Sequence, residues 1–200
     1  MLLDEQLAPI TKAVGFLELP LESAVQGMES WLRSLYDRVE REPVSGFPEM
    51  LHRLEPLTGG SRRRQLLVAA GRWTAYFDCA LRGTDPFSPI GHLSQTLLCQ
   101  GLTIRCTPHT IGVPGAVHGR SGAVQFQLLG PLKTQFLNHV RGIEAIYDGK
   151  WHFPVSGTQQ AFEEPEAYSA RRVRDRFTSA MLERYCQALG VDVFNPDDAK

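Results

Sequence analysis

The chain has 200 residues, of which 42% are hydrophobic and 22% are charged, and its formal net charge at pH 7 is −1. The apolar content excludes an intrinsically disordered chain, and the length suits a single domain over residues 1–200. The charge argues against a protein built mainly to bind nucleic acid, because phosphate binding requires an excess of basic residues.

The start of the sequence lacks the features of a targeting segment. Asp4 and Glu5 occupy positions where a secretory signal peptide is basic, and no apolar run long enough for a signal or a membrane span follows. We therefore expect a soluble, cytoplasmic protein without membrane association. In that reducing compartment the cysteines are expected to be buried thiols rather than disulfides. They are Cys79, Cys99, Cys106 and Cys186.

The first predicted element is an amphipathic helix over residues 20–42. Apolar residues from Leu21 to Val39 recur at steps of three and four, and charged residues occupy the other face, up to a stop before Pro43. We expect this apolar stripe to pack on a sheet, with Leu32 buried within its own chain. A dimer interface is the alternative destination.

Short apolar and alternating runs predict strands across a sheet region, residues 64–157. Gly71 is expected in a turn or bulge between the first two strands. Asp148-Gly149 is the strongest hairpin signal, because a type I′ turn requires positive φ. The predicted strands are 65–70, 72–80, 102–107, 123–129, 143–147 and 151–156.

Helices are predicted between and after these strands. Ser88-Pro89 has the form of a helix start, and residues 165–190 are predicted to be helical, with Thr178 capping a second segment that Gly190 ends. Short strands without helical crossovers favour an α+β fold, a mostly antiparallel sheet of about six strands with helices packed on one face. The other face is then expected to expose Thr, Gln and Arg side chains.

The sequence contains none of the familiar catalytic or cofactor motifs. A P-loop, a nucleophile elbow, a dinucleotide fingerprint and zinc-ligand spacing are all missing. We therefore expect no cofactor and no metal, and a non-catalytic role is favoured over an enzyme.

The densest polar and aromatic segment runs from Trp73 to Asp78, and Asp85 follows in a loop. Trp73 and Tyr76 are candidate binding residues, because aromatic side chains anchor tight interfaces. Asp78 and Asp85 can form a carboxylate pair for acid–base or metal chemistry. The favoured alternative is structural, with Asp78 capping a loop amide and Asp85 initiating a turn.

A long glycine-rich connection, residues 108–122, carries His109 and His118, and both are candidate site residues. Cys106 lies nearby and could serve as a nucleophile with His109 as its base. A structural role is favoured, because Cys106 falls on the apolar face of its strand and the sequence offers no third orienting group.

Two arginine runs, residues 62–64 and 171–176, raise the question of nucleic-acid binding. The second run shares its segment with acidic residues between Glu163 and Asp175, and on a helix these acids would pair with the arginines. Neither run has the interleaved aromatic residues that stack on bases. We therefore expect no nucleic-acid partner.

Three stretches resemble a bacterial family of small soluble proteins without an established activity. They are Trp73-Thr-Ala-Tyr-Phe-Asp78 with Gly83-Thr-Asp85, then Gly122-Ala-Val-Gln-Phe126 with Gly130-Pro131, and Arg171-Arg-Val-Arg-Asp-Arg-Phe177. The family assigns no catalytic residues. Its compact α+β form is similar to that of the immunity proteins of bacterial toxin systems.

Two functional hypotheses follow. The first is a non-catalytic cytoplasmic protein that binds and neutralises a toxin protein, with a homo-oligomer as a further possibility. The second is a small-molecule enzyme, hydrolase-like, whose site lies between Asp78, Asp85 and the His109–His118 loop.

Overall fold

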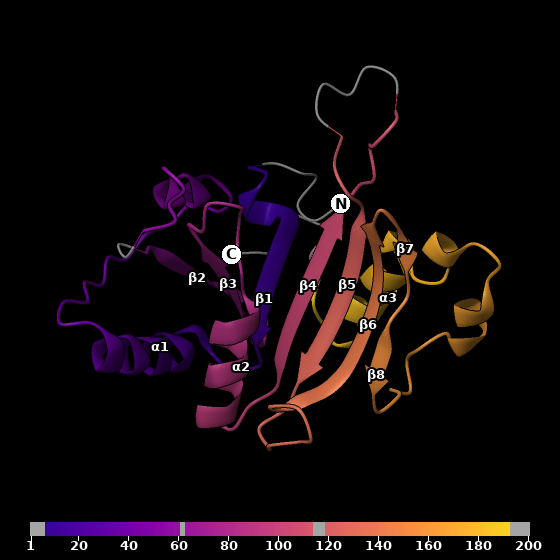
Figure 1. The fold of residues 1–200 in the computed structure, drawn as a ribbon. Helices are drawn as coiled ribbons and strands as arrows, with labels where there is room; N and C mark the ends of the chain where they lie inside the picture. Colours follow the sequence, from indigo (N-terminus) through magenta and orange to yellow (C-terminus); the bar gives the residue numbers. More distant parts are fainter. Residues whose placement is uncertain (1–6, 61–62, 114–118, 193–200) are drawn as a thin grey trace.

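The computed structural model describes residues 7–60, 63–113 and 119–192, and its centre is an antiparallel sheet (Figure 1). The strands are β1 (Ala13–Leu17), β2 (Gln65–Ala70), β3 (Trp73–Asp78), β4 (Gly101–Thr107), β5 (Ala123–Leu129), β6 (His139–Asp148), β7 (Lys150–His152) and β8 (Val155–Gly157). Their order across the sheet is β2-β3-β1-β4-β5-β6-β7, and β8 also pairs with β6. The expected α+β class is confirmed.

The central strand β1 is absent from the strands predicted by sequence. It pairs with β3 on one side and β4 on the other, with Gly15 opposite both Tyr76 and Thr103. All five of its residues are buried, so it lacks the polar alternation that marks a strand with one solvated face. Gly15 lets α2 approach, because a Cβ there would lie 2.5 Å from Cγ1 of Ile90.

The expected hairpin is confirmed at Asp148-Gly149. Asp148 pairs with Lys150 around Gly149, whose φ is +72°. The predicted final strand is divided, because β7 and β8 pair with different parts of the long strand β6.

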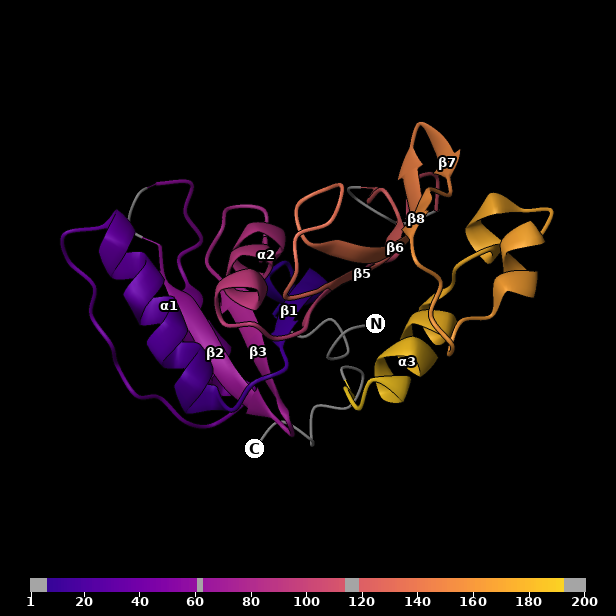
Figure 2. The same cartoon turned by 90° about the horizontal axis from the view of Figure 1, so that it is seen from below.

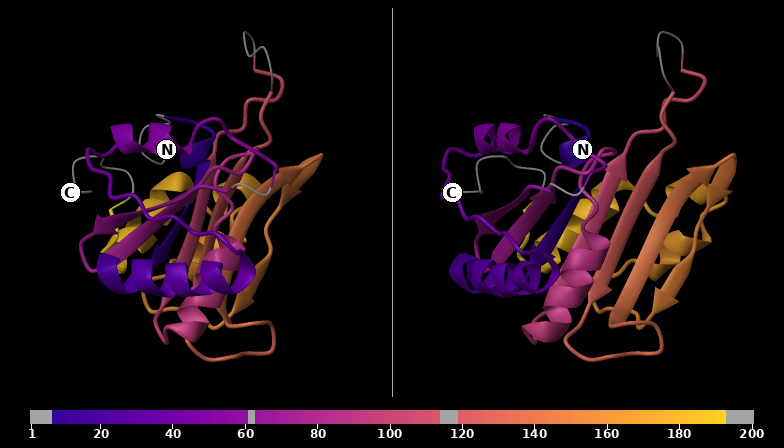
Figure 3. Two further views of the ribbon diagram at one scale, coloured as in Figure 1. Left: turned by 90° about the vertical axis from the view of Figure 1, so that its left-hand side faces the viewer. Right: turned by 60° about the vertical axis from the view of Figure 1, so that its left-hand side comes forward.

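Helices cover both faces of the sheet, which corrects the expectation of one covered face. Helices α1 (Leu21–Leu35) and α2 (Phe87–Thr96) lie on one face and α3 (Ser179–Ala188) on the other (Figures 2 and 3). The reason is that β3 is buried on both sides. Tyr76 packs with α1 and α2, and Phe77 packs with the cluster that contains α3.

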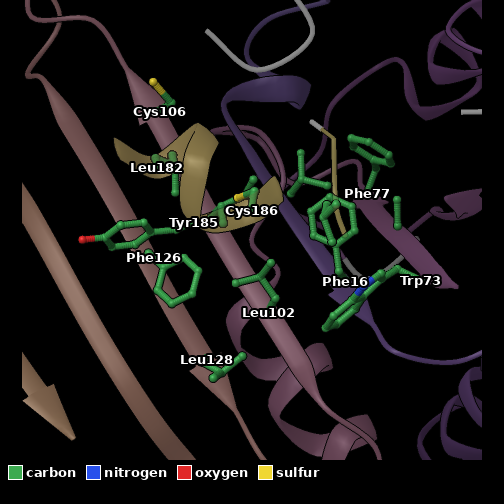
Figure 4. Packing of buried hydrophobic residues seen from close by; sticks show 14 of the residues in the cluster. Phe16, Trp73, Phe77, Leu102, Cys106, Phe126, Leu128, Leu182, Tyr185 and Cys186 are labelled. Carbon is green, nitrogen blue, oxygen red and sulfur yellow. The ribbon is translucent and has the colours of Figure 1, made fainter. Parts of the chain in front are cut away.

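The larger core lies between the sheet and α3 (Figure 4). Tyr185 of α3 is 1% exposed, and its ring centroid lies 6.0 Å from that of Phe126 of β5. Thr178 caps α3 by accepting a hydrogen bond from the Met181 N–H, and Gly190, with φ +74°, follows the end of the helix. Both predicted boundaries of this helix are confirmed.

Helix α1 is shorter than the predicted 20–42. It ends at Leu35, and Tyr36 adopts an extended backbone with φ −135° and ψ 138°. Met28 is buried, whereas Leu32, predicted to be buried within its own chain, packs on the same cluster of that chain but is only half-buried. Leu35 is 55% exposed, so the helix ends where it has little left to pack against.

The predicted C-terminal helical region, 165–190, contains a single α-helix. Ahead of α3, the chain forms two short 3-10 helices, η4 (Pro165–Ser169) and η5 (Val173–Asp175). The Nε of Arg176 donates to the carbonyl oxygen of Ala170 at 2.9 Å, which holds the bend around η5 in place.

Candidate functional site

Three of the six residues predicted for a site lie deep inside the protein. Trp73, Tyr76 and Asp78 are 0%, 1% and 3% exposed. Trp73 Nε1 donates to the carbonyl oxygen of Leu189 at 3.0 Å, just beyond α3, and Figure 4 shows its ring in the core on that face. These side chains join the sheet to its helices, and a partner cannot reach them in this conformation.

The Asp78 carboxylate is held by three hydrogen-bond donors. Its Oδ2 accepts from the Tyr76 hydroxyl at 3.0 Å and from the Asp85 N–H at 3.3 Å, and its Oδ1 accepts from the Ala80 N–H at 2.9 Å. Burial, and then the charge of Asp78, raise the pKa of the Tyr76 hydroxyl far above its usual value. The structural role expected for Asp78 is therefore confirmed, while the Asp85 side chain is exposed.

His109 lies across the sheet from Asp78. Its ring packs against Trp151, with centroids 5.4 Å apart, and Trp151 borders the core on the α3 face. Asp78 instead bonds to Tyr76, which packs beneath α1 and α2. The sheet thus separates two groups that the enzyme hypothesis requires in one site. His118 lies outside the described residues.

Cys106 and His109 line a common cavity of about 290 Å³, but His109 is poorly placed to act as a base. Its Nδ1 accepts the N–H of Gly122 at 3.3 Å, so the neutral ring carries its proton on Nε2 and has no lone pair left for a thiol. All four cysteines are buried thiols outside any disulfide, as expected, and burial raises the pKa of Cys99 to about 11.

On the face of the sheet that packs against α1 and α2, one part is covered by no described helix. Beyond α2, strands β4, β5 and β6 face outward (Figure 3). The Gln127 amide donates to Glu144 Oε1 at 2.8 Å and accepts from Thr103 Oγ1 at 3.2 Å, and Gln125 donates to Glu144 Oε2 at 2.9 Å. With Arg105 at its border, this is the expected face of Thr, Gln and Arg side chains, but Thr103 is buried and the others are half-buried rather than exposed. We call Thr103, Gln125, Gln127 and Glu144 the polar face.

Exposed apolar side chains gather at one end of the polar face. The turns 97–100 and 130–138 both lie at this end, the lower end of the sheet in Figure 1. The Asn138 amide ties the second turn to α2, donating to Gly91 O at 3.0 Å and Ser94 Oγ at 2.8 Å. The exposed residues, called the apolar end, are Leu98, Leu132, Phe136 and Leu137, with exposed fractions of 73%, 73%, 63% and 55%.

Two of these leucines have an unfavourable backbone. Leu98 and Leu137 adopt φ values of +54° and +53°. The left-handed conformation suits glycine and costs other residues about 1–2 kcal/mol. Exposed leucines in this conformation contribute little to the core. Sequence reasoning missed both, because a single leucine in a turn forms no pattern.

The sequence also missed a buried ion pair. Arg141 Nε and Nη2 donate to Glu163 Oε1 and Oε2 at 2.8 and 2.6 Å, and both side chains are at most 6% exposed. The expected pairing of Glu163 within its own segment is therefore wrong, since its partner lies 22 residues earlier, on β6. The neighbouring Glu164 pairs instead with Arg184 of α3, at 2.7 Å. Both pairs depend on tertiary structure, which residue spacing does not reveal.

Among the described residues, no three His, Cys, Asp or Glu side chains are grouped so that they can hold a metal ion. Within the same ranges, no helix has the length and apolar character needed to cross a membrane. The chain matches no protein-family model, no curated protein and no solved structure.

Proposed function

We propose that this chain is a non-catalytic, cytoplasmic binding protein of the toxin-neutralising immunity type, and that its partner protein docks on the polar face and the apolar end. The proposal rests on the exposed leucines of the apolar end, two of which retain an unfavourable backbone. Exposed apolar clusters mark interaction sites, and local strain persists where function requires it.

The arrangement of the two surfaces supports a protein partner. Phe136, 63% exposed, supplies an aromatic anchor of the kind that dominates interface energies. The polar face is ordered before binding, because Gln125 and Gln127 are already bonded to Glu144. Ordered side chains lose less conformational entropy when a partner docks.

The toxin-neutralising part of the proposal is supported by the sequence resemblance of residues 73–85, 122–131 and 171–177. The separation of Asp78 from His109 by the sheet favours it over the enzyme hypothesis. A dedicated inhibitor needs a complementary surface rather than a catalytic group.

Affinity capture from the native host, followed by co-expression with the captured protein, tests this proposal. Phe136→Asp places a charge in the apolar end, and Leu81→Asp is the control because Leu81 is 65% exposed outside that surface. We expect the wild-type protein and Leu81→Asp to capture one protein and to suppress its toxicity. Phe136→Asp should bind it at least about tenfold more weakly.

Two results would contradict the proposal. Phe136→Asp could capture and protect as well as the wild-type protein, or the captured protein could keep its toxicity when bound. A wild-type dimer that Phe136→Asp converts to a monomer in sedimentation would instead assign the surface to a second copy of this chain.

A further inference from the structure

A second cavity, of about 340 Å³, opens at the other end of β4 from the apolar end. It is bordered by the short helix η2 (Ile10–Lys12), the last residues of β4, and Arg120-Ser121. Strands β1 and β4 pair here with Ala13 opposite Arg105. This pairing brings Lys12 and Arg105 to the same cavity wall.

The described residues that line this cavity carry positive charge and no negative charge. They include Lys12, Arg105 and Arg120, and the hydroxyl groups of Thr107 and Ser121. The cavity therefore offers hydrogen-bond donors and cations together.

Lys12 and Arg105 are both half-buried, and within the described part of the chain neither forms an ion pair. There, Arg105 donates only through Nε, to Thr107 Oγ1 at 3.4 Å, and the Lys12 ammonium makes no hydrogen bond. Most Arg105 donors thus remain available to a ligand.

The two cations are crowded as well as desolvated. Burial lowers the pKa of Lys12, and the charges of Arg105 and Arg82 lower it further against the opposing effect of Asp85. Burial also lowers the pKa of Arg105, while Glu144 opposes this shift. An anion placed between the two side chains would offset both the repulsion and the desolvation.

We propose that this cavity binds the phosphate group of a small-molecule ligand. The Arg105 guanidinium presents a planar fork that matches two phosphate oxygens, and Lys12 adds a point charge. Two or more positive charges suit a dianionic phosphate better than a single carboxylate. The cavity lies at the end of β4 opposite the apolar end, and it shares Arg105 with the border of the polar face.

Thermal unfolding with inorganic phosphate at constant ionic strength tests the site, with acetate as the second anion. We expect phosphate to give a saturable rise in Tm that acetate does not reproduce. Lys12→Met and Arg105→Gln should each raise the phosphate Kd at least about tenfold. Arg53→Gln is the matched control, because the Arg53 side chain is 68% exposed and outside the cavity, and it should respond like the wild-type protein.

Amide chemical shifts of the wild-type protein give a readout that needs no variant. Phosphate should shift the signals of Lys12, Arg105 and Thr107 along one saturating curve. The proposal is overturned if no saturable response occurs, if acetate acts as strongly as phosphate, or if the shifts cluster elsewhere in the protein.

Discussion

Asp78 and Asp85, seven residues apart, occupy opposite environments. Asp78 is 3% exposed and accepts three hydrogen bonds, whereas the Asp85 side chain is exposed. The buried carboxylate accepts hydrogen bonds from loop N–H groups that would otherwise be buried without a partner. It therefore stabilises the fold. Among single residues, burial therefore separates those that build the fold from those that a partner can contact.

Asp78→Asn should lower the free energy of unfolding by about 1–3 kcal/mol, because the amide presents a donor to groups that also donate. Asp85→Asn should change it by no more than about 0.5 kcal/mol. Urea unfolding of both variants measures the difference. Equal losses of unfolding free energy in the two variants would show that the hydrogen bonds to the Asp78 carboxylate do not stabilise the fold.

Leu98→Gly and Leu137→Gly should keep or raise Tm, because glycine adopts positive φ without strain and both leucines are more than half exposed. The same variants should weaken partner binding, since they remove apolar contact area. Thermal unfolding and titration with the captured partner provide the two readouts. A loss of stability with intact binding would assign these leucines to the fold.

Among the elements, the segment ahead of α3 is held by side chains rather than by a continuous helix. Glu163 bonds to Arg141 of β6 and accepts from the Tyr168 hydroxyl at 2.9 Å, which in turn lies 3.0 Å from the Tyr185 hydroxyl of α3. Burial, then bonds to Tyr185 and Glu163, raise the pKa of Tyr168 far above its usual value. This chain of buried and half-buried polar groups joins the sheet, η4 and α3.

Glu163→Gln should lower the free energy of unfolding by about 3–5 kcal/mol, because it leaves the Arg141 guanidinium buried without a counter-charge. The neighbouring Glu164→Gln should cost less than about 1 kcal/mol, since Glu164 and Arg184 are 33% and 52% exposed. Chemical denaturation compares these adjacent substitutions directly. A Glu163→Gln variant as stable as Glu164→Gln would refute the structural importance of the buried pair.

Helix α1 offers a second comparison within one element. Met28→Ala should lower the free energy of unfolding by about 2–5 kcal/mol, because Met28 is only 4% exposed. Leu32→Ala should lower it by less, because Leu32 is half-buried. Guanidinium unfolding gives both values. A larger loss for Leu32→Ala would contradict the packing described for this helix.

In the whole molecule, the helices on both faces of the sheet depend on strand β1. It lies between β3 and β4, with α1 and α2 packed over one face of the sheet and α3 over the other. Its amides should therefore exchange with solvent only in global unfolding, whereas those of turn 130–138 should exchange much faster. Hydrogen-exchange mass spectrometry measures both. Exchange of β1 as fast as that turn would contradict its central place.

The sequence by itself determined the local elements. The bounds of β2 and β5 agree with the predicted 65–70 and 123–129, and Thr178 and Gly190 mark the ends of α3 as expected. These features depend on neighbouring residues, through side-chain alternation, capping and positive φ. The same local signals predicted the α+β class and the polar face.

Tertiary structure decided the rest. Strand β1 is identified by its partners β3 and β4, because both its faces are covered and its side chains do not alternate. The packing of helices on both faces also explains why Trp73, Tyr76 and Asp78 lie inside the protein. The Arg141–Glu163 pair, the apolar end and the Lys12–Arg105 cavity each join residues from separate parts of the chain. Residue spacing in the sequence does not predict such contacts, because they form only when the strands and helices pack together.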